Sequence, residues 1–183
     1  LAPTASTAVA MAIGDALATV WMERRGISPA DFARNHPAGA LGKQLTLTVA
    51  DLMLPTAQLH PLEESDSLSA VIALLTRDGA GACWVRRSGA PQQLAGLITD
   101  GDLRRALEHH AAAGWAELCA AQRMTADPIT VGPGMLAVEA LERMERNSRK
   151  PIGVLPVLDE AGSMLGLLRL HDLIQAGLSS SLS

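Results

Sequence analysis

Two short strings of the sequence end a predicted strand and begin a predicted helix with residues that suit an anionic ligand. In the first string, Thr99 stands where the strand ends, and Asp102 follows about one helical turn later on the same side. Backbone N–H groups and the positive end of a helix dipole favour a phosphate at such a junction, and the threonine hydroxyl adds a donor. The Asp102 carboxylate can accept both hydroxyls of a ribose. These groups describe a nucleotide site, with Asp100 as a further candidate, although helix capping by Thr99 and Asp100 explains the same residues without a ligand.

The second string keeps the carboxylate but changes the residue before it. Asp172 corresponds to Asp102, whereas Arg169 stands where the first string has Thr99, and His171 lies between. A guanidinium can bind an anion bidentately and more strongly than a hydroxyl can. It can equally pair with a local carboxylate and leave the site empty. We therefore expect two unequal sites, and the ligand of the second stays open.

The two strings belong to an internal repeat. The stretch from Gly96 to Leu103 recurs from Gly166 to Leu173, 70 positions later. A short segment further upstream, Asp51-Leu52-Met53, has a counterpart in Gln122-Arg123-Met124, shifted by one more residue. A unit of about 60 residues buries too little apolar surface to be stable alone, so we expect the two units to share sheet faces.

Hydrophobic periodicity and turn residues predict the same elements in both units. The first unit is expected to contain a helix, two strands and a second helix, at about 66–77, 82–85, 94–98 and 100–108, with a turn at 88–91. The second unit is expected to contain the same elements at about 135–146, 153–158, 165–168 and 171–176.

Composition excludes several classes of function. Aromatic residues make up 2% of the chain and its net charge is −4, both of which argue against a nucleic-acid partner. The pair Arg104-Arg105 is expected to be solvated surface. Cys83 and Cys119 are expected to be free thiols in a reducing cytosol, and the spacing of residues predicts no metal site and no cofactor. We find no apolar run approaching the length that spans a bilayer, and so expect no membrane partner.

The duplicated G-h-h-[ST]-x-x-[ND] pattern resembles a CBS-domain pair, over roughly Thr46 to Leu178. The resemblance implies an α/β fold in which each unit is a small sheet with two helices. It also implies that Thr99 contacts a phosphate and Asp102 a ribose. The expected repeats are residues 46–112 and 113–183, and His60, Arg149 and Lys150 are candidates to line their clefts.

Residues 1–45 lie outside the repeat and are expected to be mostly helical, with a long helix from about Ala8 to Arg24. Gly26 is expected to end that helix, and Ser28 to cap a short one. The strings Ala2-Pro3-Thr4-x-Ser6-Thr7, Gly14-Asp15-Ala16-Leu17-Ala18 and His36-Pro37-x-Gly39-Ala40-Leu41-Gly42 resemble the end of a sugar isomerase (SIS) domain.

A SIS domain followed by a CBS pair resembles the D-arabinose-5-phosphate isomerase family, which interconverts D-ribulose 5-phosphate and D-arabinose 5-phosphate for Kdo and lipopolysaccharide synthesis. Ala38 departs from the family, which commonly has a second glycine there. By resemblance His36 is the active-site histidine, a residue suited to moving a proton near neutral pH. The remaining catalytic residues would lie upstream of Leu1, so we expect no isomerase activity from this chain alone.

Three functions follow from these resemblances. The first is a regulatory CBS pair that binds a nucleotide such as AMP or ATP, or the sugar nucleotide CMP-Kdo, in a cytoplasmic protein that forms homodimers or, at full length, tetramers. The second is a ligand-free dimerisation scaffold with vestigial sites. The third, an enzyme acting through His36, has the least support because its catalytic partners are missing.

Overall fold

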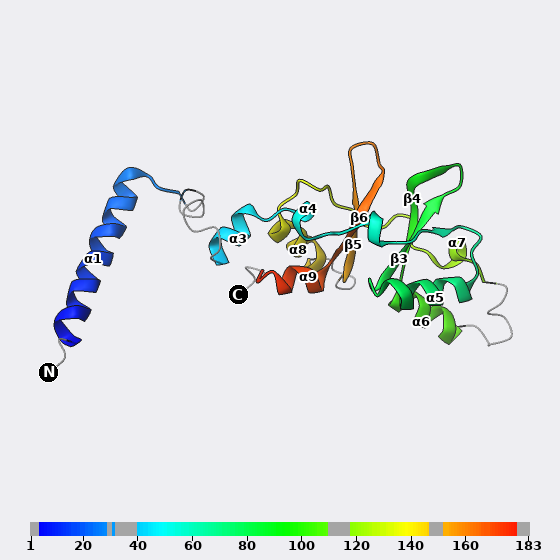
Figure 1. The fold of residues 1–183 in the computed structure, drawn as a ribbon, viewed down its shortest axis with the longest axis horizontal. Coiled ribbons are helices and arrows are strands. Elements are labelled where there is room, and N and C mark those ends of the chain that lie inside the picture. The colour runs from blue at the N-terminus through cyan, green and yellow to red at the C-terminus, as the bar shows by residue number, and fades with distance from the viewer. Residues whose placement is uncertain (1–3, 29–30, 32–39, 110–117, 147–151, 179–183) are drawn as a thin grey trace. The chain divides into compact units, whose positions relative to one another are not determined.

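The structure, a computed structural model, describes residues 4–28, 31, 40–109, 118–146 and 152–178, and its fold is mixed α/β as expected (Figure 1). Contacts within the chain divide it into two units, Leu1–Leu45 and Thr46–Ser183. The first unit contains α1 (Thr4–Arg25) and most of α3 (Ala40–Thr46). The second unit contains, in chain order, α4 (Val49–Leu52), β1 (Leu54–Pro55), the 3-10 helix η1 (Thr56–Gln58), β2 (Leu62–Glu63), α5 (Leu68–Asp78), β3 (Ala82–Arg87), β4 (Ala90–Thr99), α6 (Asp100–His109), α7 (Ala120–Arg123), α8 (Ala137–Glu145), β5 (Val154–Leu158), β6 (Met164–Arg169) and α9 (Leu170–Gln175).

The helix α1 begins at Thr4, earlier than predicted, and ends where Gly26 takes a left-handed φ of 62°. Alanines flank the threonine and serine residues of its first turns, and alanine favours helix strongly enough to extend it. Ser28 and Asp31 bond to each other: the Asp31 carboxylate accepts from the Ser28 hydroxyl at 2.7 Å, and the Asp31 amide donates back to that hydroxyl at 3.2 Å. The short helix expected after Ser28 falls mostly outside the described residues.

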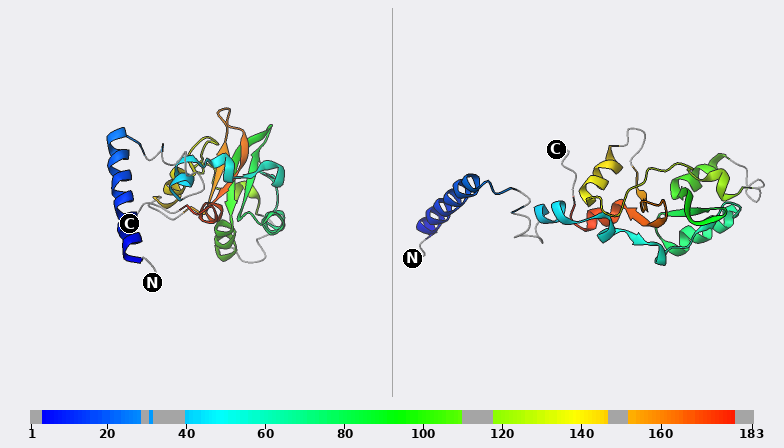
Figure 2. Two further views of the ribbon diagram at one scale, coloured as in Figure 1. Left: turned by 60° about the vertical axis from the view of Figure 1, so that its left-hand side comes forward. Right: turned by 90° about the horizontal axis from the view of Figure 1, so that it is seen from above.

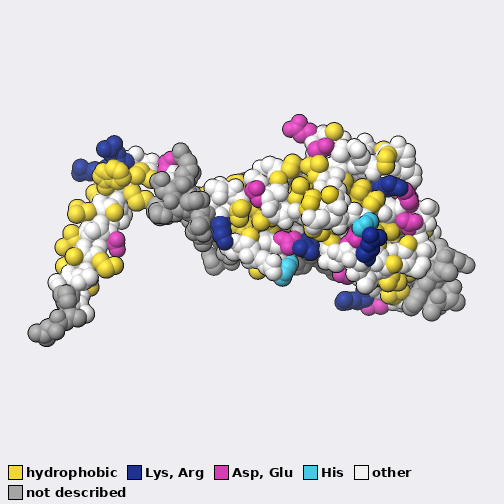
Figure 3. Space-filling view, viewed as in Figure 1, with side chains coloured by type: hydrophobic (Ala, Val, Ile, Leu, Met, Phe, Trp, Pro, Cys, Tyr) yellow, Lys and Arg dark blue, Asp and Glu magenta, His cyan; other side chains and the backbone are white. Residues whose placement is uncertain are grey.

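No residue of α1 is buried within the described part of the chain. Six of its large apolar side chains are more than half exposed, and Figure 3 shows apolar side chains in yellow along the helix: Val9, Met11, Ile13, Leu17, Val20 and Trp21. With 22 residues, α1 is long and apolar enough to cross a membrane by length and composition alone. The expectation that no segment approaches that length is therefore wrong, because alanines between the larger residues keep the whole helix apolar. A core helix of a soluble protein meets the same criterion.

The second unit contains two three-stranded sheets, with the strand orders β2-β3-β4 and β1-β6-β5. Each sheet is built on an antiparallel hairpin, β3–β4 or β5–β6, and the hairpins stand side by side with a bridge between Gln93 and Ser163 (Figures 1 and 2). The elements predicted for both repeats are all present. The turn between β3 and β4 is shorter than predicted, because Gly89 adopts a φ of 80° and the strand resumes at Ala90.

The two repeats exchange the segments that lead into them. The first lead-in segment, residues 47–55, places Val49 in the apolar core of the second repeat, among Leu141, Leu155 and Leu168. The second lead-in segment, residues 118–125, places Ala120 in the core of the first repeat. The expected repeats 46–112 and 113–183 therefore divide the sequence by similarity, whereas each core is completed by the other repeat's lead-in segment.

Two glycines at matching places allow this exchange. β1 pairs antiparallel with β6, and a side chain at Gly166 would collide with the backbone oxygen of Leu54. In the first repeat Thr125 bridges Leu97, and a Cβ atom at Gly96 would lie 2.8 Å from the oxygen of Thr125. Both glycines are thus required by the close approach of a lead-in backbone.

Candidate functional site

At the first junction β4 ends at Thr99 and α6 begins at Asp100, and the two predicted ligand-binding residues bind each other. The Thr99 hydroxyl donates to Oδ2 of Asp102 at 2.7 Å, and the Thr99 amide donates to the same oxygen at 2.9 Å. The Asp102 amide donates back to the hydroxyl at 3.3 Å. This reciprocal capping box is the ligand-free alternative for Thr99 that the sequence left open. The other carboxylate oxygen of Asp102 accepts from Arg105, so Arg105 is exposed but not simply solvated.

At the second junction β6 ends at Arg169, whose guanidinium forms a bidentate pair with Asp172. Nε donates to Oδ2 at 2.6 Å and an Nη atom donates to Oδ1 at 2.7 Å. The hydrogen bonds to Asp172 raise the pKa of Arg169, so the guanidinium stays charged at any physiological pH. Of the two outcomes expected for Arg169, pairing with a local carboxylate is the one observed.

An open cleft of about 380 Å³ lies against the second junction. One side is formed by the junction itself, through Arg169, Asp172 and the end of α9. The opposite side is formed by the first lead-in segment and η1. The lining residues are Asp51, Leu52, Met53, Leu54, Pro55, Gln58, Arg169, Asp172, Gln175 and Ala176. A charged pair beside an apolar wall can hold a ligand with an anionic group and a flat, less polar part.

The other predicted site residues are placed less favourably. Asp100 is exposed in the first turn of α6, and its amide donates to the carbonyl of Gly81 at 3.4 Å. His171 is exposed on α9 and does not line the cleft. His36, Arg149 and Lys150 lie outside the described residues.

His60 contacts its own repeat. Its Nδ1 lies 2.9 Å from an Asp78 carboxylate oxygen, and its Nε2 lies 2.9 Å from an Arg77 nitrogen. Asp78 is almost fully buried, and it also accepts from the His60 amide at 2.9 Å. This arrangement ties the start of β2 to the end of α5, and His60 is absent from the lining of the cleft.

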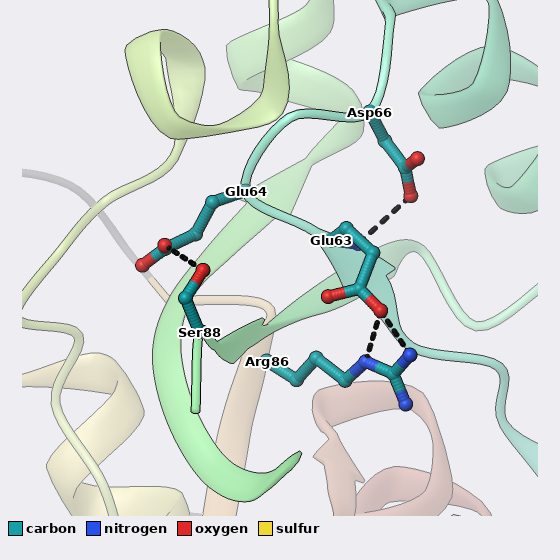
Figure 4. Close-up of polar contacts among 5 residues, drawn as sticks. All are labelled: Glu63, Glu64, Asp66, Arg86 and Ser88. Carbon is teal, nitrogen blue, oxygen red and sulfur yellow. Dashed lines mark hydrogen bonds and ion pairs between the residues drawn. The ribbon is translucent and has the colours of Figure 1, made fainter. Parts of the chain in front are cut away.

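A second polar cluster joins β2 to β3 (Figure 4). Glu63 pairs with Arg86, whose Nε donates at 2.5 Å, and this hydrogen bond lowers the pKa of Glu63. Asp66 accepts from the Glu63 amide at 2.8 Å, and Glu64 accepts from Ser88 at 2.6 Å. Each carboxylate therefore has a partner within the repeat, so the role of the cluster is to hold β2 and β3 together.

The residues on the side of the cleft opposite Arg169, in the first lead-in segment and η1, were not predicted from the sequence. The signal was present in the repeat, because Asp51-Leu52-Met53 recurs as Gln122-Arg123-Met124. Only the exchanged pairing of β1 with β6 shows that each of these segments faces the junction of the other repeat.

The fold of the second unit is that of CBS-domain proteins. The CBS domain family matches residues 117–179. The CBS domain of a bacterial CNNM/CorC family Mg²⁺ transporter, solved in complex with ATP, has a TM-score of 0.62 at 20% identity, covering 74% of this chain and 89% of that one. CBSX2 in complex with AMP has a TM-score of 0.58 at 23% identity, covering 72% of this chain and 96% of that one.

The sequence is also similar to a particular group of enzymes. It is 42% identical to the arabinose 5-phosphate isomerase KdsD of Pseudomonas aeruginosa over 177 residues, which is 97% of this chain and 52% of that protein. The resemblance inferred from the His36 string and the CBS repeats is confirmed, and the chain spans about half the length of this relative.

Proposed function

We propose that the chain is the CBS pair of an arabinose 5-phosphate isomerase, and that it binds a nucleotide or sugar nucleotide at its strand–helix junctions to regulate that enzyme. The cleft at the second junction carries the proposal. Its volume of about 380 Å³ suits a small ligand, and Arg169 and Asp172 lie side by side on its wall. A guanidinium is the preferred partner of a phosphate, and a carboxylate accepts the two hydroxyls of a ribose.

Two solved structures with the same fold contain AMP or ATP, which supports a nucleotide as the ligand class. CMP-Kdo offers the same phosphate and ribose together with an acidic sugar, and as a product of the pathway it would make the chain a feedback sensor. The proposal includes a cytoplasmic homo-oligomer in which His36 serves an active site completed by residues outside this chain.

A second candidate is a ligand-free dimerisation scaffold. One observation favours it: both carboxylates already have side-chain partners. Asp102 accepts from Thr99 and Arg105, and Asp172 accepts from Arg169. A ligand would have to replace some of these contacts.

The two candidates are separated by titrating the 183-residue chain with AMP, ATP, CMP and CMP-Kdo, using calorimetry and thermal unfolding. A ligand that binds only the folded state raises the apparent stability by about 2.7 kcal/mol at a hundredfold excess over the dissociation constant. We expect saturable binding of at least one nucleotide, weakened in Arg169→Ala. The control Arg104→Ala removes the same charge from an exposed position on α6 and should bind as the unmodified chain does. If none of the four ligands binds, the scaffold is the better account.

A further inference from the structure

Arg123, the last residue of α7, has a buried guanidinium nitrogen without a partner. Its Nε atom is shielded from solvent and makes no hydrogen bond within the described residues. A buried donor that is left unpaired destabilises the fold, and the effect is larger when the group is charged. Such a group calls for a functional explanation.

The second lead-in segment places Arg123 beside the first junction. Thr125 bridges Leu97 in antiparallel orientation, with hydrogen bonds of 2.8 and 3.0 Å between their backbones. Arg123 lies two residues before Thr125 and ends α7, which contacts both β4 and α6, the two elements that meet at Thr99. Met124, which stands between Arg123 and Thr125 in the sequence, packs against Gly96. A Cβ atom on Gly96 would lie 2.7 Å from the Met124 side chain.

The second junction shows where the residue that corresponds to Arg123 lies. There Leu52, which corresponds to Arg123 in the repeat, ends α4 two residues before the pairing of Leu54 with Leu167, and it lines the cleft together with Arg169. Each junction therefore has one arginine at these two matching positions. In the second junction it is Arg169, at the end of β6, and in the first it is Arg123, at the end of α7.

The two arginines differ in what they are bound to. Arg169 is held by Asp172, whereas the corresponding carboxylate of the first junction, Asp102, is held by Thr99 and Arg105. The side chain of Arg105 folds back over the first turn of α6, since a Cβ atom at Gly101 would lie 3.5 Å from its Nη1. The first junction thus combines the Arg105 guanidinium, the Thr99 hydroxyl and an Arg123 nitrogen that has no carboxylate partner.

We infer that Arg123 is a specificity-determining residue that binds the phosphate of the ligand at the first junction. This inference rests on the proposed nucleotide-binding function and names the anion contact of one site. A phosphate there satisfies the unpaired nitrogen of Arg123. The first junction should therefore favour ligands with an accessible, multiply charged phosphate group.

The test compares Arg123→Leu, which installs the residue type of the second junction, with Arg123→Lys and the charge control Arg104→Leu. Calorimetry with inorganic pyrophosphate and with AMP measures binding, and thermal unfolding without ligand measures stability. We expect Arg123→Leu to weaken binding of both probes about tenfold or more, because a charge-assisted hydrogen bond is lost. Arg123→Lys keeps the charge and should recover part of the affinity, and Arg104→Leu should change it little.

The same Arg123→Leu variant should unfold about 2–4 °C higher than the unmodified chain, because a buried unpaired donor has been removed. Weaker binding together with higher stability is the signature of a ligand-binding arginine, which a merely structural role would not produce. Unchanged affinity in Arg123→Leu, while Asp102→Asn loses binding, would overturn the role of Arg123 and leave the nucleotide site standing. No binding of any probe by the unmodified chain would overturn both.

Discussion

The two strand–helix junctions have the same backbone design but different polar chemistry. In the first, Thr99 and Asp102 form a capping box, and Arg105 pairs with the remaining carboxylate oxygen. In the second, Arg169 takes the place of Thr99 and holds Asp172 through two hydrogen bonds. The difference shows that duplication preserves the carboxylate and the glycine that admits the lead-in strand, while the groups around the carboxylate diverge. Two sites of one fold can therefore differ in ligand, affinity or both.

The largest expected effect comes from the glycines that admit the lead-in strands. Gly166→Ala should lower the free energy of unfolding by about 3 kcal/mol, because its Cβ atom would collide with the Leu54 backbone, which cannot rotate away. Gly96→Ala should cost less, about 2 kcal/mol, because part of its collision is with the flexible side chain of Met124. Urea denaturation of both variants measures the order, and equal or reversed losses would show that the two lead-in strands are not held as described.

The next largest effect is the difference between the contributions that the two junction ion pairs make to stability. Arg169→Ala leaves the largely buried Asp172 carboxylate without its bidentate partner and should cost about 2 kcal/mol. Arg105→Ala removes a pair whose arginine is 49% exposed and should cost about 0.5 kcal/mol. Double-mutant cycles, Arg169→Ala with Asp172→Ala and Arg105→Ala with Asp102→Ala, measure each coupling. Similar coupling energies in both cycles would remove the proposed asymmetry.

The capping box gives a smaller effect that is specific to the first junction. Thr99→Ala removes the side chain that accepts from the Asp102 amide and should lower stability by about 1 kcal/mol. Thr99→Ser keeps the hydroxyl and should restore most of the loss. Chemical denaturation checks both variants, and a neutral Thr99→Ala would mean that the hydroxyl does not cap α6.

The smallest expected effect is a pH dependence of stability that the first lead-in segment should show and the second should not. α4 is capped by Thr48 and Asp51, and the hydrogen bonds from Thr48 lower the pKa of Asp51 from its usual value of 3.8. A carboxylate with a lowered pKa stabilises the fold above its unfolded pKa, and this contribution is lost as pH falls through the folded value.

α7 uses the amide of Gln122 in the matching position, which does not titrate. The stability difference between the unmodified chain and Asp51→Asn should therefore shrink as the pH is lowered from 6 to 3, as measured by urea denaturation at each pH, since protonation of Asp51 removes the advantage of the carboxylate. A difference that does not change with pH would show that Asp51 is not the charged cap.

Much of this fold could be predicted from the sequence, because its signals are local. The hydrophobic periodicity and turn residues predicted the hairpins, the helix expected from about residue 66 is α5 with Ser67 as its N-cap, and the spacing of 70 residues identified the repeat. The exchange of lead-in segments could not be predicted, since the pairing of Leu54 with Leu167 depends on residues far apart in the chain. The apolar length of α1 was underestimated because alanines separate its larger apolar residues, so the sequence contains no continuous run of large apolar side chains there.

The candidate site was predicted only in part. Thr99, Asp102, Arg169 and Asp172 were identified from their spacing, but their partners depend on side-chain geometry that no pattern specifies. Arg105 was expected to be solvated surface, whereas in α6 its guanidinium lies beside Gly101 and donates to Asp102. Arg123 was visible only as one member of a weak repeat, and its unpaired Nε is a property of packing.

The most direct test is a titration of the isotopically labelled chain with AMP, followed through its backbone amide resonances by NMR. The account predicts saturable shifts at the first junction, residues 99–102 and 123–125, at lower AMP concentration than at the second, residues 51–55 and 169–172. The first junction should respond earlier because the Arg123 nitrogen is unpaired, whereas the Arg169 guanidinium is already bound to Asp172. Shifts confined to other surfaces, or no saturable shift at either junction, would contradict the account.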